Sequence, residues 1–255
     1  MELLSIAEEA ARAAGAVLLE RFGGPRREVR SKSTPTDLVS EADIEAERAL
    51  RAVLAARRPD DAVLGEEGGD RGAGTSGVRW IVDPLDGTVN FLFGIPQWAV
   101  SVACAGGDGL IAGVVLDPLR DEVFAAAREG PATRDGEAME ASSRGELATA
   151  MVATGFAYDA QVRAAQAAVA ARVLPRVRDL RRMGSAALDL AWTACGRYDA
   201  YYERGLQPWD RAAGELLCAR AGLELRELRS DGALPAGLLA APATLAGPLH
   251  GLVGP

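Results

Sequence analysis

Two aspartates three positions apart, Asp83 and Asp86, have the types and spacing of residues that do chemistry. They follow the apolar, β-prone run 80–82, which predicts a buried strand. Carboxylates at positions i and i+3 across a strand-ending turn can converge on one point, where a cation relieves their mutual repulsion. Gly87 and Thr88 come next, and unpaired amides at the start of a helical turn attract an anion such as phosphate. The stretch therefore predicts a joint site for a divalent cation and a phosphate.

Two alternative interpretations of this stretch are weaker. An ordinary D-x-x-D-G surface turn needs no metal, but it does not explain the apolar run before it. Phosphatases that form an aspartyl-phosphate carry D-x-D-G-T, whereas Pro84 and one further residue separate the two aspartates here. The observed spacing suits two metal ligands better than a nucleophile and an acid. Hard oxygen ligands without histidine or thiolate favour Mg²⁺ or Mn²⁺ over zinc.

The composition excludes several other chemistries. His250 is the only histidine, which removes most Ser-His-Asp, Cys-His and phosphohistidine mechanisms and the histidine-rich zinc sites. The 3 cysteines are scattered and form no C-x-x-C pair, so we expect reduced thiols in a cytoplasmic protein. The net charge of -8 argues against nucleic acid as the main partner. No apolar run approaches the ~20 residues of a membrane span, and the N-terminus lacks the basic region of a secretory signal.

The helices and strands that must position these residues follow a different order in the two halves of the chain. The first half reads as α+β, with helices at 2–21 and 40–58 and strands at 61–67, 80–83, 99–105, 110–116 and 122–127. The second half alternates strands at 151–154, 180–183, 199–203, 223–228 and 238–241 with helices at 160–173, 185–195, 210–221 and 245–252. We therefore predict an N-terminal α+β subdomain over 1–145 and a C-terminal α/β subdomain over 146–255.

Three ordered motifs give the sequence a specific resemblance. They are Gly-Glu-Glu-Gly at 65–68, Trp-Ile-Val-Asp-Pro-Leu-Asp-Gly-Thr-Val-Asn-Phe at 80–91 and Pro-Trp-Asp-Arg-Ala-Ala-Gly at 208–214. Together with the runs 37–43, 184–190 and 196–203, they resemble the inositol monophosphatase family over nearly the whole chain. The resemblance implies a layered αβαβα sandwich of the sugar-phosphatase type, with an antiparallel-sheet part followed by an α/β part. It also implies a Mg²⁺-dependent, lithium-sensitive phosphomonoesterase that forms a homodimer.

The resemblance implies oxygen ligands for two or three Mg²⁺ ions per site. The first ion would be held by Glu66, Asp83 and the carbonyl of Leu85. The second would be held by Asp83, Asp86 and Asp210. Glu67 would support the cluster, through water to a weaker third ion.

The resemblance also assigns the catalytic and substrate-side residues. Asp43 and Thr88 would position and deprotonate the attacking water beside Glu66, while the amides of Gly87 and Thr88 would receive the phosphate. Two metals in such a site stabilise the attacking and leaving oxygens of an in-line displacement. The substrate-binding residues would be Asp86, Gly87, Thr88, Gly184, Ser185, Ala186, Glu203 and Asp210.

Several of these positions have a plain alternative. Glu203 could accept hydrogen bonds from neighbouring substrate hydroxyls, or it could be a solvated residue after a strand. Asp210 could cap the helix that begins near it. Lys32, the only lysine in the chain, lies where the family has an N-terminal lysine and could place a compact charge near the metals, or it could be drift. The arginines between 172 and 182 favour a solvated or subunit-interface face over substrate attraction.

The predicted reaction is hydrolysis of inositol 1-phosphate, a small-molecule phosphate monoester, to inositol and phosphate by a metal-activated water. Histidinol phosphate, adenosine 3',5'-bisphosphate and fructose 1,6-bisphosphate are alternative substrates within the family. A non-catalytic, metal-dependent interaction protein is the alternative from another class. Phe93 stands where many relatives carry histidine, a departure close enough to the motif to affect the choice of substrate.

Overall fold

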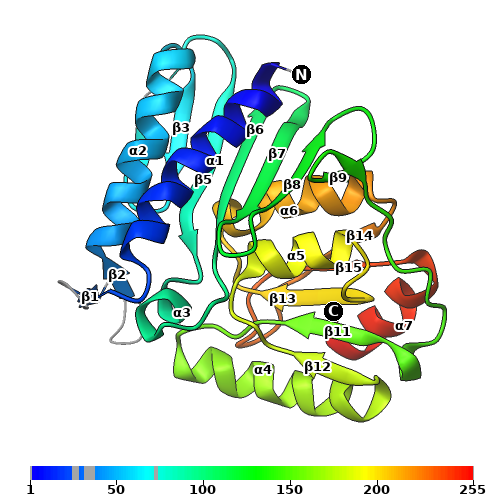
Figure 1. The fold of residues 1–255 in the computed structure, drawn as a ribbon. Coiled ribbons are helices and arrows are strands. Elements are labelled where there is room, and N and C mark those ends of the chain that lie inside the picture. The colour runs from blue at the N-terminus through cyan, green and yellow to red at the C-terminus, as the bar shows by residue number, and fades with distance from the viewer. Residues whose placement is uncertain (1, 25–28, 32–37, 72–73, 255) are drawn as a thin grey trace.

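The computed structural model of the chain describes residues 2–24, 29–31, 38–71 and 74–254. Two β-sheets alternate with three layers of helices (Figure 1). Lys32 lies outside the described residues, so its predicted role near the metal site stays a prediction.

The helical layers follow from where each helix buries its apolar residues. Helices α1 (Glu2–Arg21) and α2 (Glu41–Arg57) pack against each other on one face of the larger sheet. Helices α5 (Ala186–Ala194) and α6 (Pro208–Arg220) lie between the two sheets, and α5 is buried on nearly every side. Helices α4 (Ala160–Val173) and α7 (Ala243–Val253) cover the outer face of the smaller sheet. The predicted αβαβα sandwich is confirmed.

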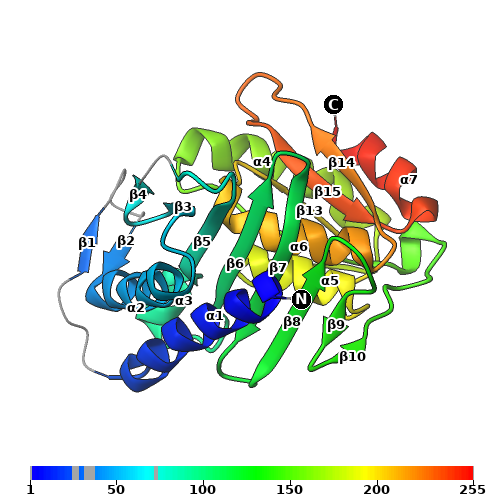
Figure 2. The same cartoon turned by 90° about the horizontal axis from the view of Figure 1, so that it is seen from above.

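The larger sheet has eight strands in the order β10-β9-β8-β7-β6-β5-β3-β4 among the described residues, and α1 crosses it (Figure 2). Only the pair β3–β5 is parallel. The central strand β6 is apolar without alternation because helices cover both of its faces. The strands are β3 (Ala62–Gly65), β4 (Gly69–Arg71), β5 (Arg79–Asp86), β6 (Ala99–Gly106), β7 (Gly109–Asp117), β8 (Glu122–Ala127), β9 (Thr133–Arg134) and β10 (Glu137–Ala138).

The smaller sheet has the order β12-β11-β13-β15-β14. Its strands are β11 (Met151–Thr154), β12 (Asp179–Arg181), β13 (Ala200–Arg204), β14 (Glu224–Leu228) and β15 (Gly237–Ala241). Strand β11 pairs in parallel with β12 and β13, and the remaining pairs are antiparallel. The chain passes from the first sheet to the second between Ala138 and Met151, and the subdomain boundary near 145 stays a prediction.

Most predicted helices and strands agree with the structure to within a few residues. The elements that were not predicted are short: the hairpin of β1 (Val29–Ser31) with β2 (Leu38–Ser40), strands β4, β9 and β10, and helix α3 (Thr88–Phe93). Strand β5 was expected to end at Asp83, but it continues to Asp86. The strand can continue because an irregularity in its pairing with β6 absorbs the turn that the sequence suggested.

Helix α6 approaches both α5 and the larger sheet closely because two positions lack a side chain. A Cβ on Gly214 would lie 2.5 Å from Cβ of Leu190 in α5, and a Cβ on Gly113 of β7 would lie 2.9 Å from Cα of Ala213. The opposing atoms belong to backbone or to the root of a side chain, so they cannot move aside without shifting an element. These two glycines therefore set the thickness of the layer between the sheets.

Replacing Gly214 with alanine should destabilise the fold by roughly 1–3 kcal/mol, because the added methyl group overpacks the contact with Leu190. Urea unfolding followed by circular dichroism measures this change. Gly107→Ala is the matched control, since a Cβ there meets nothing within 4 Å, and it should cost nothing. Equal stability of the two variants would show that the α5–α6 contact tolerates the extra volume.

Candidate active site

An irregularity in strand β5 gives the two central aspartates their spacing. Asp83 pairs with Ser101 and Asp86 with Ala99, so β5 has one more residue than β6 between these pairs. A bulge of this kind bends a strand and re-aims its side chains. Pro84 suits the bulge because it has no N–H to give to the ladder. Asp83 also accepts a hydrogen bond from the amide of Leu85 at 2.9 Å, which fixes its carboxylate over the bulge.

The turn into α3 needs a glycine. Gly87 has φ 102°, in the left-handed region, and a Cβ there would lie 3.0 Å from the carbonyl oxygen of Gln97 and 3.2 Å from that of Gly184. Only a residue without a side chain fits both the backbone angle and this gap. The chain therefore turns directly from Asp86 into α3, and the amides of Gly87 and Thr88 are placed beside the two aspartates.

Thr88 and Asp43 form a buried pair although 45 positions separate them. The Thr88 hydroxyl lies 2.9 Å from Oδ1 of Asp43 and 3.1 Å from the carbonyl oxygen of Leu85. Asp43 belongs to α2 and has no exposed surface, and Thr88 is 7% exposed. The predicted catalytic pair is thus brought together by the packing of α2 against the end of β5.

Glu66 lies in the turn between β3 and β4, and a residue that the sequence did not suggest supports this turn. Glu47 of α2 accepts hydrogen bonds from the amides of Glu67 at 2.8 Å and Gly68 at 2.9 Å. Its carboxylate is also paired with Arg51 one helical turn later, at 2.5 Å. Glu47 is 3% exposed, so the turn beside Glu66 is tied to a buried ion pair. The Glu–Arg spacing of four was the only signal in the sequence.

The second half of the chain reaches the site through the loop before α5. Ser185 donates a hydrogen bond to Oδ2 of Asp86 at 2.6 Å, and the amide of Ala187 donates to the same oxygen at 2.7 Å. Asn90 of α3 donates to the carbonyl oxygens of Gln97 at 2.7 Å and Met183 at 2.8 Å. The sequence did not single out Asn90, which joins the two halves of the site.

These elements enclose a cavity of about 490 Å³, a size typical of small-molecule sites. Ten of the predicted residues line it: Glu66, Asp83, Leu85, Asp86, Gly87, Thr88, Gly184, Ala186, Glu203 and Asp210. Asp43 and Ser185 lie behind this lining, each hydrogen-bonded to one of its members. Glu67 and Phe93 are not among the residues that line the cavity, and Phe93 is 60% exposed at the end of α3. Phe93 therefore does not contact a substrate bound in this cavity.

Two alternative interpretations can now be judged. Glu203 is half-buried in β13 and lines the cavity, so the interpretation of a solvated residue is wrong. Asp210 accepts a hydrogen bond from the amide of Gln207 at 2.7 Å at the start of α6. Asp210 is therefore not the cap residue that the sequence suggested, because α6 begins at Pro208 and Gln207 is its N-cap. Its carboxylate stabilises the helix start from the third helical position, and it lines the cavity as well. Of the arginines between 172 and 182, Arg182 also lines the cavity, which the sequence did not predict.

Burial and mutual repulsion dominate the electrostatics of the cavity. Burial raises the pKa of Asp83 well above its usual range, and the neighbouring charges of Glu66, Asp86 and Asp210 raise it further. Burial likewise raises the pKa of Asp210 well above normal, with Asp86 adding to the effect. Burial raises the pKa of Asp86 to about 6, against the hydrogen bonds from Ser185 and Ala187 that lower it. Four carboxylates therefore crowd a place where water cannot separate their charges.

This donor set fits a hard divalent cation in type. It consists of carboxylate and carbonyl oxygens with no histidine or thiolate, and a cation would offset the repulsion that raises these pKa values. Within the described residues, however, no three acidic, histidine or cysteine side chains already form a group that could hold a metal. Asp86 and Asp210 instead accept hydrogen bonds from neighbouring amides. A cation would have to compete with these bonds.

A further buried carboxylate lies close to the site. Asp189 of α5 is 1% exposed, and its Oδ1 has no hydrogen-bond partner among the described residues. Burial raises its pKa well above the usual range, and the charges of Glu203 and Asp86 add to this. The sequence did not assign a role to Asp189, because an aspartate on an apolar helix gives no signal of what it will face.

Fold and cavity together define a class: phosphatases built as an αβαβα sandwich with carboxylates at the junction of the two sheets. A model of the inositol monophosphatase family matches residues 1–249. The chain therefore belongs to the inositol monophosphatase family, whose members are generally metal-dependent phosphatases. The resemblance seen in the sequence is confirmed. No helix in the described ranges is long and apolar enough to cross a membrane.

Individual relatives agree with this assignment. The chain is 46% identical over 212 residues to the inositol-1-monophosphatase SuhB of Mycobacterium tuberculosis, covering 80% of this chain and 73% of the relative. It is 38% identical over 221 residues to the Nus factor SuhB of Salmonella typhimurium, covering 86% and 83% of the two chains. The solved structure of the extragenic suppressor protein suhB from Bartonella henselae matches with a TM-score of 0.92 at 33% identity, covering 99% of this chain and 98% of that one.

The crowded carboxylates predict a stability that depends on pH when divalent cations are removed. Asp83, Asp86 and Asp210 have raised pKa values in the folded chain. Their contribution to stability is complete below the unfolded pKa of about 4 and is lost as pH rises through the folded value. For Asp86 the loss should span pH values from about 4 to about 6. Urea unfolding in a chelator should therefore show decreasing stability over this range.

Two further measurements check the cause of this decrease. Asp86→Asn should flatten the pH dependence, because the amide cannot ionise. Added Mg²⁺ should restore stability at the upper end, because it binds the ionised carboxylates. A decrease that persists unchanged in the variant would show that Asp86 does not cause it.

Proposed function

We propose that this phosphatase hydrolyses inositol 1-phosphate to inositol and phosphate, using Mg²⁺ held by the cavity carboxylates. The observation that supports this proposal is the single cavity lined by Glu66, Asp83, Asp86 and Asp210, directly beside the amides of Gly87 and Thr88. The carboxylates provide hard oxygen ligands and the amides provide donors to a phosphate. A phosphate ester is negatively charged, so the carboxylates alone would repel it. It needs both the cations that the carboxylates bind and the amides that donate to its oxygens.

The predicted ligand assignment is kept within this proposal. Glu66, Asp83 and the Leu85 carbonyl would hold the first ion, and Asp83, Asp86 and Asp210 would hold the second. Glu67 supports the cluster through the turn that Glu47 stabilises. Bound Mg²⁺, which Mn²⁺ could replace, supplies the charge that activates a water and stabilises the phosphoryl oxygens.

Side chains and backbone amides orient the attacking water and the phosphate. Asp43 accepts a hydrogen bond from the Thr88 hydroxyl, which leaves the oxygen of Thr88 as the acceptor of a hydrogen bond from an attacking water. The buried carboxylate of Asp43 fixes this direction, because no solvent competes for it. Glu66 lines the same cavity as Thr88 and completes the polar surroundings of the water. The amides of Gly87 and Thr88 hold the phosphate, so the water and the phosphorus are aligned before reaction.

Residues from the second half of the chain bind the alcohol part of the substrate. Gly184, Ala186 and Glu203 line the same cavity, and Ser185 acts on it through Asp86. Glu203 offers carboxylate oxygens to hydroxyl groups, which an inositol ring has on each side of the ester. Two features favour inositol 1-phosphate over a bisphosphate. The cavity has an excess of acidic groups, and among the described residues that line it Arg182 and Arg204 are the only basic ones.

Histidinol phosphate, adenosine 3',5'-bisphosphate and fructose 1,6-bisphosphate remain alternative substrates. The non-catalytic alternative gains one observation, since the relative from Salmonella typhimurium carries the name Nus factor SuhB. The Asp43–Thr88 pair argues for turnover in this chain, because a scaffold has no use for an oriented water. We keep lithium sensitivity and a homodimer as parts of the proposal that the family resemblance implies. A cytoplasmic location is kept because the scattered cysteines favour reduced thiols.

Phosphate release from the four substrates named above tests the proposal most directly. Inositol 1-phosphate should be hydrolysed with the highest kcat/KM, only when Mg²⁺ is present, and added Li⁺ should inhibit. A higher kcat/KM for one of the other three substrates would replace the proposed substrate. Failure on every substrate, with Mg²⁺ and with Mn²⁺, would favour the non-catalytic alternative.

Asp86→Asn should lower kcat by more than about a hundredfold, because it removes a charged ligand and weakens the interaction with Ser185. Phosphate release and Mg²⁺ titration measure the loss, and circular dichroism checks that the variant stays folded. Asp108→Asn, in the exposed β6–β7 turn, is the control and should leave activity unchanged. Near-normal activity of Asp86→Asn would show that the metal assignment is wrong.

A further inference from the structure

Strand β13 presents two neighbouring tyrosines to opposite faces of the smaller sheet. Tyr201 is fully buried in the core between the sheets, whereas Tyr202 belongs to the core under α4 and α7. Glu203 follows, and successive side chains of a strand alternate between faces. Glu203 therefore lies on the face of Tyr201, toward the large cavity that it lines.

The Tyr201 hydroxyl holds one oxygen of Glu203. It donates a hydrogen bond to Oε2 of Glu203 at 2.9 Å, and Tyr201 has no exposed surface. Oε1 of Glu203 makes no hydrogen bond within the described part of the chain. A carboxylate with one oxygen fixed and the other directed to a cavity can still accept hydrogen bonds from a ligand. The position of this acceptor depends on the tyrosine.

A missing side chain on the neighbouring strand makes room for the same carboxylate. Strand β11 pairs in parallel with β13, with Thr154 opposite Tyr202, so Gly155 comes next to Glu203. A Cβ on Gly155 would lie 2.1 Å from both carboxylate oxygens of Glu203. Gly155 does not have a left-handed φ, so its backbone would accept alanine and only the space forbids it.

We propose that Tyr201 and Gly155 are positioning residues: they hold Glu203 in the orientation in which it accepts hydrogen bonds from neighbouring hydroxyl groups of the substrate. The inference rests on the proposed function and deepens it. Tyr201 sets the orientation of the carboxylate, and Gly155 lets it lie flat against the sheet. Polyol hydroxyls then satisfy the remaining lone pairs of Glu203 without reorganisation.

Binding of a phosphate ester whose alcohol part carries no further hydroxyl group is disfavoured for the complementary reason. When it fills the cavity, Glu203 loses water and gains no donor in exchange, and sites built to bond a hydroxyl discriminate strongly against ligands that lack one. The discrimination depends on a fixed carboxylate, since a mobile one could turn away to solvent. Removing the support should therefore weaken the binding of polyol esters selectively.

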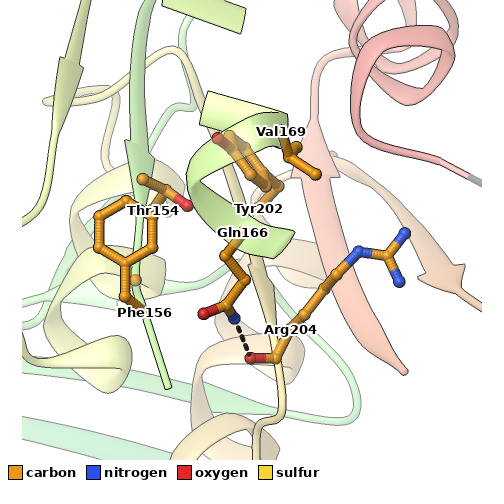
Figure 3. Close-up of a pocket in the computed structure, with 7 residues that line it drawn as sticks. Thr154, Phe156, Gln166, Val169, Tyr202 and Arg204 are labelled. Carbon is orange, nitrogen blue, oxygen red and sulfur yellow. Dashed lines mark hydrogen bonds between the residues drawn. The ribbon is translucent and has the colours of Figure 1, made fainter. Parts of the chain in front are cut away.

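Tyr202 provides a control within the same strand. It belongs to the core under α4 and α7 and lines a small cavity together with Thr154, Gly155, Phe156, Gln166, Val169 and Arg204 (Figure 3). Its hydroxyl makes no hydrogen bond to Glu203. Tyr202→Phe therefore removes the same group from the neighbouring residue without changing the support of the carboxylate.

The test compares inositol 1-phosphate with phenyl phosphate, which has no hydroxyl groups, in steady-state assays with Mg²⁺. Tyr201→Phe should raise KM for inositol 1-phosphate roughly tenfold with kcat changed less than about threefold, since it removes a hydrogen bond to a charged acceptor. The same variant should leave kcat/KM for phenyl phosphate within about twofold of wild type, and Tyr202→Phe should change neither substrate.

Gly155→Ala displaces the carboxylate without changing the tyrosine, and it should show the same selective loss for inositol 1-phosphate. It replaces Tyr201→Phe in the comparison if that variant does not fold. Equal losses on both substrates, or no loss on either, would overturn the inference while wild-type turnover leaves the proposed function standing. Wild-type protein that is inactive on both substrates would overturn the proposed function, and this inference with it.

Discussion

The crowding of carboxylates at the junction of the two sheets is the constraint on which the rest of the structure depends. Burial raises the pKa of Asp83, and the charges of Glu66, Asp86 and Asp210 add to that increase. Such groups destabilise a fold unless other groups hold them and a counter-charge is available. The surrounding structure supplies the holding groups, and the chemistry of the oxygens calls for a divalent cation as the counter-charge.

The holding groups come from every layer that borders the site. Asp43 and Glu47 lie one turn apart on α2, and they support Thr88 and the turn after Glu66 respectively. On the opposite side Ser185 bonds to Asp86, and Asn90 joins α3 to the loop before α5. The site is thus assembled across the boundary between the two sheets. A variant that loosens the packing of these layers should lower the activity by displacing the site residues, although the mutated residue contacts no ligand.

Much of this could be predicted from the sequence because local pattern and local structure agree. The apolar periodicity of α1 and α2 and the apolar runs of β6 to β8 gave their positions closely. Local pattern failed where a contact distant in sequence decides the conformation. The bulge at Pro84 extends β5 because β6 pairs across it, and Glu47 binds amides twenty residues away. The support of Glu203 by Gly155 was invisible for the same reason, since a glycine that makes room reads as a loop residue.

By itself the sequence determined the layered fold, the family and the chemical type of the site: hard oxygen donors beside phosphate-binding amides, without a usable histidine. These follow from residue types and short spacings, which the backbone translates directly into strands, turns and helix starts. Only the tertiary structure decided which side chains meet. It placed Asp43 behind Thr88, turned Asp210 to its own helix end, excluded Phe93 from the cavity and left one oxygen of Glu203 for a ligand. Such contacts arise from the packing of layers, and packing joins residues that no interval in the sequence relates.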